Sequence, residues 1–252
     1  MKRVRALAGR SARERSGLLL VEGPQSVREA VRFAPERIRD IYVTDGARVA
    51  HPEIVDEALE AGLYVHPVTD EVAAALSGDA QGVTAVLTRE PDAGLESLPA
   101  APSQVLVLSN VRDPGNAGAA IRVADAAGAD AVVLAGDCVD VDSPKVIRST
   151  AGSLFHLPVL RGGPLGDVVD ALRKRGVAVL AADVSGQREL GQATSSLVAA
   201  SHAWVMGNEA WGLSAEELAL VDEAVRIPIR GRAESLNLAT ATAVCLYARV
   251  LG

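Results

Sequence analysis

The second half of the chain contains a series of short, uniformly apolar runs, each followed by a longer stretch. We expect buried strands at Val105–Ser109, Ala131–Ala135, Val177–Ala182 and Ala203–Met206, and helices at Ala117–Ala127 and Leu165–Arg175. Strands without polar alternation are typical of a parallel sheet that helices cover on both faces. The second half is therefore predicted to be an α/β domain.

The first part of the chain repeats this alternation on a smaller scale. We expect strands at Leu18–Val21, Ile38–Val43, Leu63–Val65 and Val83–Leu87, and helices at Pro24–Phe33 and Pro52–Ala61. Residues 90–103 are rich in Pro, Ala and Ser and have no period of 2 or 3.6, which indicates a linker. The sequence thus predicts domains at 1–90 and 104–252 with a linker at 91–103. Residues 237–251 predict a last helix that packs on the core or on a second subunit.

Composition favours a soluble protein of the cytoplasm. The 252 residues contain two cysteines, Cys138 and Cys245, each inside an apolar run, which suits free thiols better than a disulfide framework. The charged start lacks the apolar segment of a signal peptide, and no apolar run approaches the roughly 20 residues that span a bilayer. Secretion and membrane insertion are therefore not expected.

Charge is unevenly distributed along the chain. Up to Asp40 there are ten Lys or Arg and five acids, which leaves +5 here and −12 in the remainder of a chain whose net charge is −7. A basic leading end predicts either a solvated tail and helix face or a surface that contacts nucleic acid, and composition does not decide between them.

A first polar loop, NVRDPGNAGAAIR, follows the strand expected at Val105–Ser109. Asp113-Pro114-Gly115 is turn chemistry, Asn116 is predicted to be the N-cap of the next helix, and Gly128 ends that helix. A strand, a turn and a helix N-terminus can bind an anion. By themselves, Asn116 could simply be a cap and Arg122 could simply form an ion pair.

Two more loops follow short apolar runs later in the chain. In MGNEAWGLS, Gly207 and Gly212 allow close backbone approach, Glu209 is the one charge, and Ser214 with Glu217 predicts a helix-starting capping box. In IPIRGRAESLN, Ser235 and Asn237 both precede the last helix, and only one of them can cap it.

Several kinds of active site are not indicated. The chain has no phosphate-loop lysine motif, no GxGxxG, no HExxH and no G-x-S-x-G nucleophile elbow, and its four histidines lack the spacing of metal ligands. No metal site is expected.

Taken together and in this order, the three loops resemble the three motifs of SpoU-type (TrmH-like) RNA ribose 2'-O-methyltransferases of the SPOUT superfamily. Nearly the whole chain is similar, because LLLVEGPQSVREAV through QGVTAVL resembles the N-terminal RNA substrate-binding domain of many members. The resemblance implies a catalytic domain with a mostly parallel sheet and a trefoil knot, an exception to the rule that chains avoid knots. It also implies S-adenosylmethionine as cofactor, an RNA substrate and a homodimer.

The resemblance also implies roles for individual residues. Backbone around Gly207, Ile227 and Leu236, with Ala182, would hold the cofactor, and the reacting ribose would lie among Asn116, Arg122, Glu209, Ser235 and Asn237. Lys145 and Arg148 in SPKVIRSTAGSLFHL, and Arg10 in the basic leading end, are the RNA-contact candidates.

The chemistry of Arg122 and the identity of residue 210 modify what the resemblance implies. A guanidinium offers donors only, so we expect Arg122 to stabilise a developing alkoxide and clamp a phosphate rather than to act as a simple base. Many members have Gly where this chain has Ala210, so the turn there should avoid positive φ.

Three functions follow as alternatives: a 2'-O-methyltransferase of ribosomal RNA, the same activity on transfer RNA, or an RNA-binding module with a degenerate site. Ribosomal RNA is preferred because of the separate N-terminal domain, and the presence of all the implied site residues argues against the binding module. A Rossmann-type methyltransferase is disfavoured because no GxG turn follows the first strand of the second domain.

Overall fold

The computed structural model describes residues 2–191 and 195–251. The chain divides into two compact units, one made of Met1–Pro91 with Asp140–His156 and the other of Asp92–Val139 with Leu157–Gly252. Along the described residues, no helix combines the length and the apolar character that crossing a bilayer requires.

The first unit is built on a four-stranded sheet of order β1-β4-β2-β3. β4 is antiparallel to β1 and β2, whereas β3 is parallel to β2. Its strands are β1 (Leu18–Glu22), β2 (Ile38–Thr44), β3 (Val65–Val68) and β4 (Val83–Thr88). Its helices are α1 (Lys2–Arg5), α2 (Arg10–Ser16), α3 (Pro24–Phe33), α4 (Asp45–Ala50), α5 (Pro52–Glu60), α6 (Asp70–Leu76) and α8 (Pro144–Ser149), with 3-10 turns at Ala6–Ala8, Pro35–Arg37 and Ser153–Phe155.

The core of this unit includes a residue from outside the predicted domain. Apolar side chains of the strands, α3 and α5 pack together, and Ile147 of α8 is buried among them. Arg148 also pairs with Glu22 and Asp79. Residues 140–156 therefore group with the first unit, although the sequence predicts one contiguous domain from 104 to 252.

The second unit is built on a seven-stranded sheet of order β7-β6-β5-β10-β8-β11-β9, in which every neighbouring pair is parallel. Its strands are β5 (Gln104–Ser109), β6 (Ala131–Ala135), β7 (Val159–Gly163), β8 (Ala178–Ala182), β9 (Arg188–Glu189), β10 (His202–Met206) and β11 (Glu223–Arg226). Its helices are α7 (Pro114–Ala126), α9 (Leu165–Arg173), α10 (Ser195–Ala199), α11 (Ala215–Leu220) and α12 (Leu238–Val250), with a 3-10 turn at Leu95–Ser97. The predicted α/β class is confirmed.

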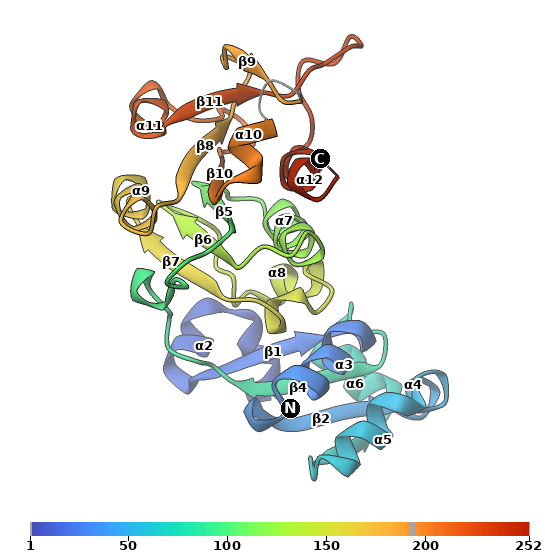
Figure 1. The fold of residues 1–252 in the computed structure, drawn as a ribbon. Helices are drawn as coiled ribbons and strands as arrows, with labels where there is room; N and C mark the ends of the chain where they lie inside the picture. Colours follow the sequence, from blue (N-terminus) through green and yellow to red (C-terminus); the bar gives the residue numbers. More distant parts are fainter. Residues whose placement is uncertain (1, 192–194, 252) are drawn as a thin grey trace. The chain divides into compact units, whose positions relative to one another are not determined.

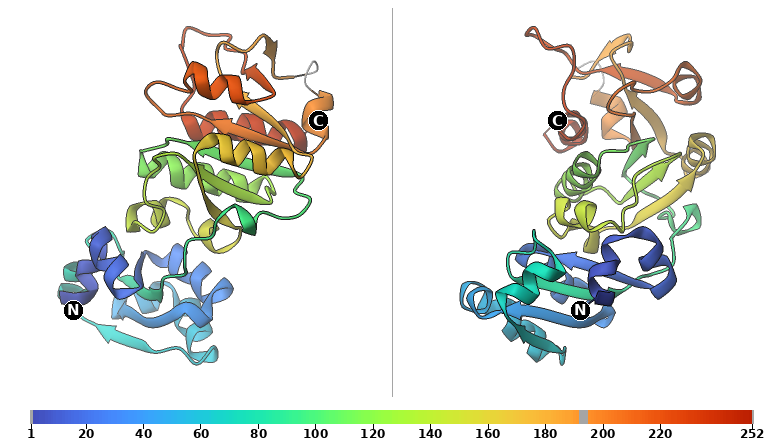
Figure 2. Two further views of the ribbon diagram at one scale, coloured as in Figure 1. Left: turned by 90° about the vertical axis from the view of Figure 1, so that its left-hand side faces the viewer. Right: turned by 180° about the vertical axis from the view of Figure 1, so that it is seen from behind.

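Helices cover both faces of this sheet (Figures 1 and 2), as the uniformly apolar strands predict. α9 and α11 lie on one face, and α7 and α12 on the other. Val105 and Val107 belong to the core that includes the apolar side of α9, and the alternate residues Leu106 and Leu108 are fully buried as well. Because both faces of the sheet are buried, the strands can present side chains to a ligand at their ends.

The stretch predicted as a linker packs on the second unit. Leu98 is 5% exposed and belongs to the core of that unit. The guanidinium of Arg175 donates to the carbonyls of Pro99 and Leu95, at 3.2 and 3.3 Å. One buried leucine and the hydrogen bonds from the Arg175 side chain to two backbone carbonyls therefore hold this segment against the second unit.

Candidate functional site

Four loops meet at the carboxyl ends of neighbouring strands. The strands β5, β10, β8 and β11 are consecutive in the sheet, so the loops that follow them lie along one edge. This edge is where ligands bind in open parallel sheets. A cavity of about 520 Å³ opens there, within the size range of small-molecule sites. Its lining is formed by Asn116, Ala182, Asp183, Val184, Met206, Gly207, Asn208, Glu209, Ala210, Trp211, Gly212, Ile227, Ile229, Ser235, Leu236, Asn237, Leu238 and Ala241.

The loop after β10 is held by the side chain of Asn208, which is 6% exposed. Its Nδ2 donates to the carbonyl of Asn110 at 2.7 Å, and its Oδ1 accepts from the N–H of Ala210 at 2.8 Å. Its backbone forms a two-way bridge with Gly212. One buried amide therefore fixes this loop and ties it to the loop after β5.

The loop after β10 requires glycine at two positions, Gly207 and Gly212. A Cβ on Gly207 would lie 2.5 Å from the carbonyl carbon of Gly212 and 2.7 Å from the N–H of Leu213, so no side chain fits. Gly212 has a φ of +68°. Ala210 is not among the described non-glycine residues with positive φ, which confirms the expectation for this position.

The loop after β5 differs from its prediction in one detail. The N-cap of α7 is Asp113, whose Oδ1 accepts from the N–H of Asn116 at 2.7 Å, and Pro114 occupies the first helical position. The assignment of Asn116 as the cap was wrong, because proline at the first position fixes the cap one residue before it. The side chain of Asn116 is therefore available to the cavity that it lines. Gly128 follows the end of α7 with a φ of +71°, as predicted.

Glu209 joins the two loops. Its carboxylate accepts from the N–H groups of Arg112 and Asp113, at 3.4 and 3.2 Å, and from Nδ2 of Asn116 at 3.4 Å. Carboxylates are acceptors only, and backbone N–H groups before a helix N-terminus favour negative charge. The anion-binding position predicted for this turn is thus occupied by a side chain of the protein itself.

The third loop, residues 227–237 after β11, joins the same network through Asn237. This residue is the N-cap of α12, with Oδ1 accepting from Ala239 and Thr240, and its Nδ2 donates to Oδ1 of Asn116 at 2.8 Å. Ser235 lines the cavity, is exposed and has no hydrogen bond to another described residue. Asn237 therefore caps the helix, and the Ser235 hydroxyl faces the cavity without a partner in the described chain.

Arg122 lies apart from this group. It is exposed on α7, does not line the cavity and forms no ion pair with another described residue. Six residues at about 100° each place it roughly 120° around the helix from Asn116. The structure brings Asn116, Glu209 and Asn237 into one hydrogen-bonded chain, but it does not bring Arg122 to them.

The four residues suggested for the cofactor, Ala182, Gly207, Ile227 and Leu236, all line the cavity. The lining combines these apolar and backbone surfaces with two carboxylates, those of Asp183 and Glu209, and it includes no lysine or arginine. Such a cavity disfavours a phosphate group and suits a ligand with an apolar part and a positive charge.

The basic leading end is partly engaged in ion pairs. Five of its ten cations are paired with carboxylates, at 2.6 to 3.2 Å for their shortest contacts: Arg10, Arg13, Arg28, Arg32 and Arg37. Arg13 is buried and also donates to the carbonyls of Leu7 and Ala8. Of the suggested RNA contacts, Arg10 and Lys145 are exposed, while Arg148 holds Glu22 and Asp79.

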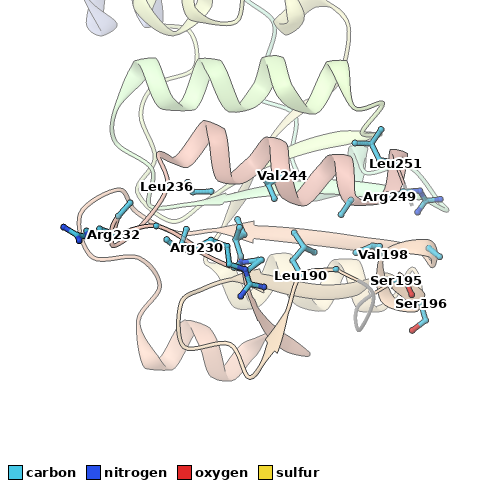
Figure 3. Close-up of a pocket in the computed structure, with 18 residues that line it drawn as sticks. Leu190, Ser195, Ser196, Val198, Arg230, Arg232, Leu236, Val244, Arg249 and Leu251 are labelled. Carbon is cyan, nitrogen blue, oxygen red and sulfur yellow. The ribbon is translucent and has the colours of Figure 1, made fainter.

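A second and larger cavity, of about 1120 Å³, lies between α12, α10 and the third loop (Figure 3). It shares Ile227, Ile229 and Leu236 with the first cavity. Leu190, Val198, Val244 and Leu251 add apolar surface, and Arg230, Arg232 and Arg249 are its cations. The third loop thus forms a wall of both cavities.

The described residues contain no group of three or more His, Cys, Asp or Glu that could hold a metal ion. Cys138 and Cys245 are free, and burial raises the pKa of both thiols. Neither is a reactive thiolate near neutral pH.

Sequence reasoning missed three residues that organise the site: Asn110, Asp113 and Asn208. The Asp-Pro pair was a usable signal, because aspartate before a proline at the first helical position is a common cap. Asn110 has a φ of +55°, which asparagine tolerates. Nothing in the sequence indicates the bond from Asn208 to Asn110, since it joins residues 98 positions apart.

Comparisons with known proteins agree with this architecture. Residues 103–247 match the model of the SpoU rRNA Methylase family, and residues 20–92 match that of RNA 2'-O ribose methyltransferase substrate binding. The chain is 34% identical over 239 residues to the 23S rRNA (guanosine(2553)-2'-O)-methyltransferase RlmP of Bacillus subtilis, covering 93% of this chain and 89% of the relative. It is also 34% identical to the 23S rRNA (guanosine-2'-O-)-methyltransferase RlmB of Bordetella pertussis, covering 92% and 96%.

Solved structures give the same result. The SpoU methyltransferase AviRb from Streptomyces viridochromogenes in complex with the cofactor AdoMet superposes with a TM-score of 0.84 at 29% identity, covering 99% of this chain and 96% of that one. An AdoMet-bound rRNA methyltransferase from Sinorhizobium meliloti gives 0.82 at 29%, covering 98% and 92%. Since the family model spans more than half of the chain and the relatives match along nearly all of it, this protein belongs to the SpoU rRNA methylase family.

Proposed function

We propose that this protein transfers a methyl group from S-adenosylmethionine to a ribose 2'-hydroxyl of 23S ribosomal RNA. The observation that carries the proposal is the cavity at the strand ends, where the lining combines apolar surface with carboxylates and lacks cations. The two relatives that match along nearly the whole chain are 23S rRNA 2'-O-methyltransferases by name, and AviRb is solved with AdoMet.

The residues of the cavity fit this cofactor. S-adenosylmethionine has an apolar adenine and a sulfonium cation, which match the apolar wall and the carboxylates of Asp183 and Glu209. Gly207 allows the close backbone approach that a Cβ would prevent. We assign Ala182, Gly207, Ile227 and Leu236 to cofactor binding, mainly through their backbone.

The chemistry then depends on positioning. When bound, the cofactor supplies a methyl group on a sulfonium centre that is already a good leaving group, so the chain's own residues must align a weak nucleophile and stabilise its loss of a proton. We assign this alignment to the linked side chains of Asn116, Glu209 and Asn237, with the Ser235 hydroxyl as a further contact to the ribose.

Arg122 has a separate role in this proposal. It lies outside the cavity lining and is exposed without an ion-pair partner among the described residues. A guanidinium in that position is suited to bind a phosphate of the RNA next to the reacting ribose, and it remains charged throughout.

We propose that residues 1–90 bind the RNA substrate and residues 104–252 catalyse the transfer, with 91–103 between them. The two family matches, at 20–92 and 103–247, support this division. Arg10, Lys145 and Arg148 are the proposed RNA contacts; the exposure of Arg10 and Lys145 favours them, and Arg148 would have to exchange a carboxylate for a phosphate. The trefoil knot expected from the resemblance stays a prediction.

We further propose a homodimer in the cytoplasm. Val244, Val250 and Leu251 at the end of the chain are 39%, 53% and 82% exposed, and apolar surface of this kind at one helix is typical of an interface. The free thiols suit a reducing compartment. Light scattering of the purified chain would measure the mass directly, and a monomer at micromolar concentration would contradict the dimer.

The function is tested with purified protein, S-adenosylmethionine labelled at the methyl group, and separate pools of unmodified 23S rRNA, 16S rRNA and transfer RNA. We expect label in 23S rRNA alone. Label in transfer RNA instead would contradict the proposed substrate but keep the activity. No label in any pool, with cofactor binding absent in calorimetry, would overturn the activity itself.

A further inference from the structure

The two tryptophans of the chain have opposite environments. Trp204 in β10 is fully buried, whereas Trp211, in the loop that follows, is 57% exposed and lines the candidate cavity. The chain has only two tryptophans, two phenylalanines and three tyrosines among 252 residues. An exposed indole beside a proposed active site is therefore a specific feature that packing of the core does not explain.

The fold does not depend on the Trp211 side chain. The turn that carries it is closed by backbone bonds between Asn208 and Gly212, at 2.9 and 3.1 Å, and by the bond from Ala210 N–H to the Asn208 side chain. These contacts hold the indole at the cavity without burying it. Placement by a rigid turn is what a contact residue requires.

A second planar group lies against the indole. The guanidinium carbon of Arg112 is 5.5 Å from the centre of the Trp211 ring, and Nη2 of Arg112 donates to Asp137 at 2.7 Å. The side chains of Arg112 and Asp137 are 58% and 78% exposed. Exposed cation–π pairs are weak, so this contact orients the two groups more than it stabilises the protein.

We propose that Trp211, oriented by Arg112, is a stacking platform for a base of the RNA substrate next to the ribose that is methylated. This inference rests on the proposed function. Proteins recognise unpaired RNA bases by stacking them on aromatic rings or guanidinium planes, because every base has a π face. Arg112 adds the positive charge that the cavity lining lacks and that a neighbouring phosphate requires.

The cavity also explains why a base would lie there. A ribose that presents its 2'-hydroxyl to Asn116 and Asn237 brings its own base and its neighbours to the rim, and Trp211 is the aromatic residue of the lining. Stacking with little hydrogen bonding tolerates several bases, so the platform would strengthen RNA binding more than it would select a sequence.

The test uses steady-state methyl transfer with 23S rRNA and calorimetry with S-adenosylmethionine on three variants. Trp211→Leu keeps apolar volume but removes the π face, and Trp211→Phe keeps a ring. Leu220→Ala, at an apolar residue that is 37% exposed in the same unit, is the matched control. We expect Trp211→Leu to raise the KM for RNA by about 5- to 150-fold, the range for loss of one base–aromatic stack. Trp211→Phe should recover most of this loss, and Leu220→Ala should match the wild type.

Three outcomes would overturn the inference. A KM for RNA of Trp211→Leu within twofold of the wild type would remove the platform. An equal loss of cofactor affinity would assign the indole to S-adenosylmethionine instead, and no recovery in Trp211→Phe would rule out stacking. Failure of the wild-type protein to transfer methyl groups would contradict the proposed function, and this result is distinct because the wild type is measured first.

Discussion

Asn208 gives the sharpest test of how the site is built, because one buried side chain joins two loops. Replacing it by alanine removes the 2.7 Å bond to the Asn110 carbonyl and the 2.8 Å bond from the Ala210 N–H. A neutral hydrogen bond contributes about 1 kcal/mol net, and a buried group left without a partner costs about 1 to 3 kcal/mol. Ala210 is exposed and can bind water instead, so the cost falls mainly on the Asn110 carbonyl. We expect a loss of about 2 kcal/mol.

This loss acts on the conformation of the loop that lines the cavity. If all of it opposes the binding conformation, Asn208→Ala weakens the affinity for S-adenosylmethionine by about 30-fold, measured by calorimetry. The melting temperature should fall by no more than about 4 to 8 °C, since about 2 kcal/mol is lost in a domain of this size.

The isosteric variant Asn208→Asp separates hydrogen bonding from packing. It keeps the acceptor for the Ala210 N–H but turns a second acceptor toward the Asn110 carbonyl and places a charge at a buried position, so it should bind at least as weakly as Asn208→Ala. If both variants kept the affinity and the melting temperature of the wild type, the loop would hold its position without this amide, and Asn208 would not be what fixes it.

Three further predictions concern the catalytic unit. Gly207→Ala would place a Cβ 2.5 Å from the carbonyl carbon of Gly212. The affinity for S-adenosylmethionine should therefore fall more than about 10-fold, which is about 1.4 kcal/mol. Gly166→Ala, whose Cβ would meet nothing within 4 Å, is the control, and equal affinities of the two variants in calorimetry would contradict the close approach. Arg122→Ala should abolish methyl transfer while cofactor affinity stays within about twofold, since Arg122 lies outside the cavity and a twofold change is only about 0.4 kcal/mol. Parallel loss of transfer and of cofactor affinity would exclude the role in RNA binding. Burial, opposed by a hydrogen bond to a backbone carbonyl, lowers the pKa of His202, so the unfolded chain binds a proton that the folded chain does not. The free energy of unfolding should therefore fall as the pH drops below about 6.5, the pKa of the histidine in the unfolded chain, by at most about 1.4 kcal/mol per pH unit. Urea denaturation at pH 7.5 and 5.5 measures this change. A His202→Gln variant with the same pH dependence would argue against this histidine as the cause.

Predictions from the sequence succeeded where local pattern decides the structure. The helix Pro24–Phe33 and the strand Ala131–Ala135 have the predicted bounds, because a proline-started amphipathic segment and an apolar run between glycine-rich turns leave few alternatives. Strands β7 and β9 at the two edges of the sheet, and β11 beside β9, were missed because strands at and near an edge do not need uniformly apolar residues.

Predictions were incomplete where contacts between residues far apart in the sequence determine the structure. Asn116 was taken as a cap although its side chain bonds to Asn237, 121 positions later. Ile147 was placed with the second domain but is buried in the core of the first unit. The anion-binding turn before α7 was expected to receive a ligand, yet Glu209 occupies it. The burial of Ile147 and the place of Glu209 depend on tertiary contacts that no local period encodes, whereas the cap of α7 was readable from the Asp113-Pro114 pair.

The chemical identity of the product shows whether the protein methylates a ribose 2'-hydroxyl. The wild-type protein is incubated with S-adenosylmethionine and unmodified 23S rRNA, and the RNA is then digested to nucleosides and measured by mass spectrometry. We expect one new nucleoside that carries the methyl group on its ribose; in the intact RNA, the phosphodiester that follows this nucleotide should resist alkali. A methyl group on a base, or no methylated nucleoside while the cofactor still binds, would contradict this expectation.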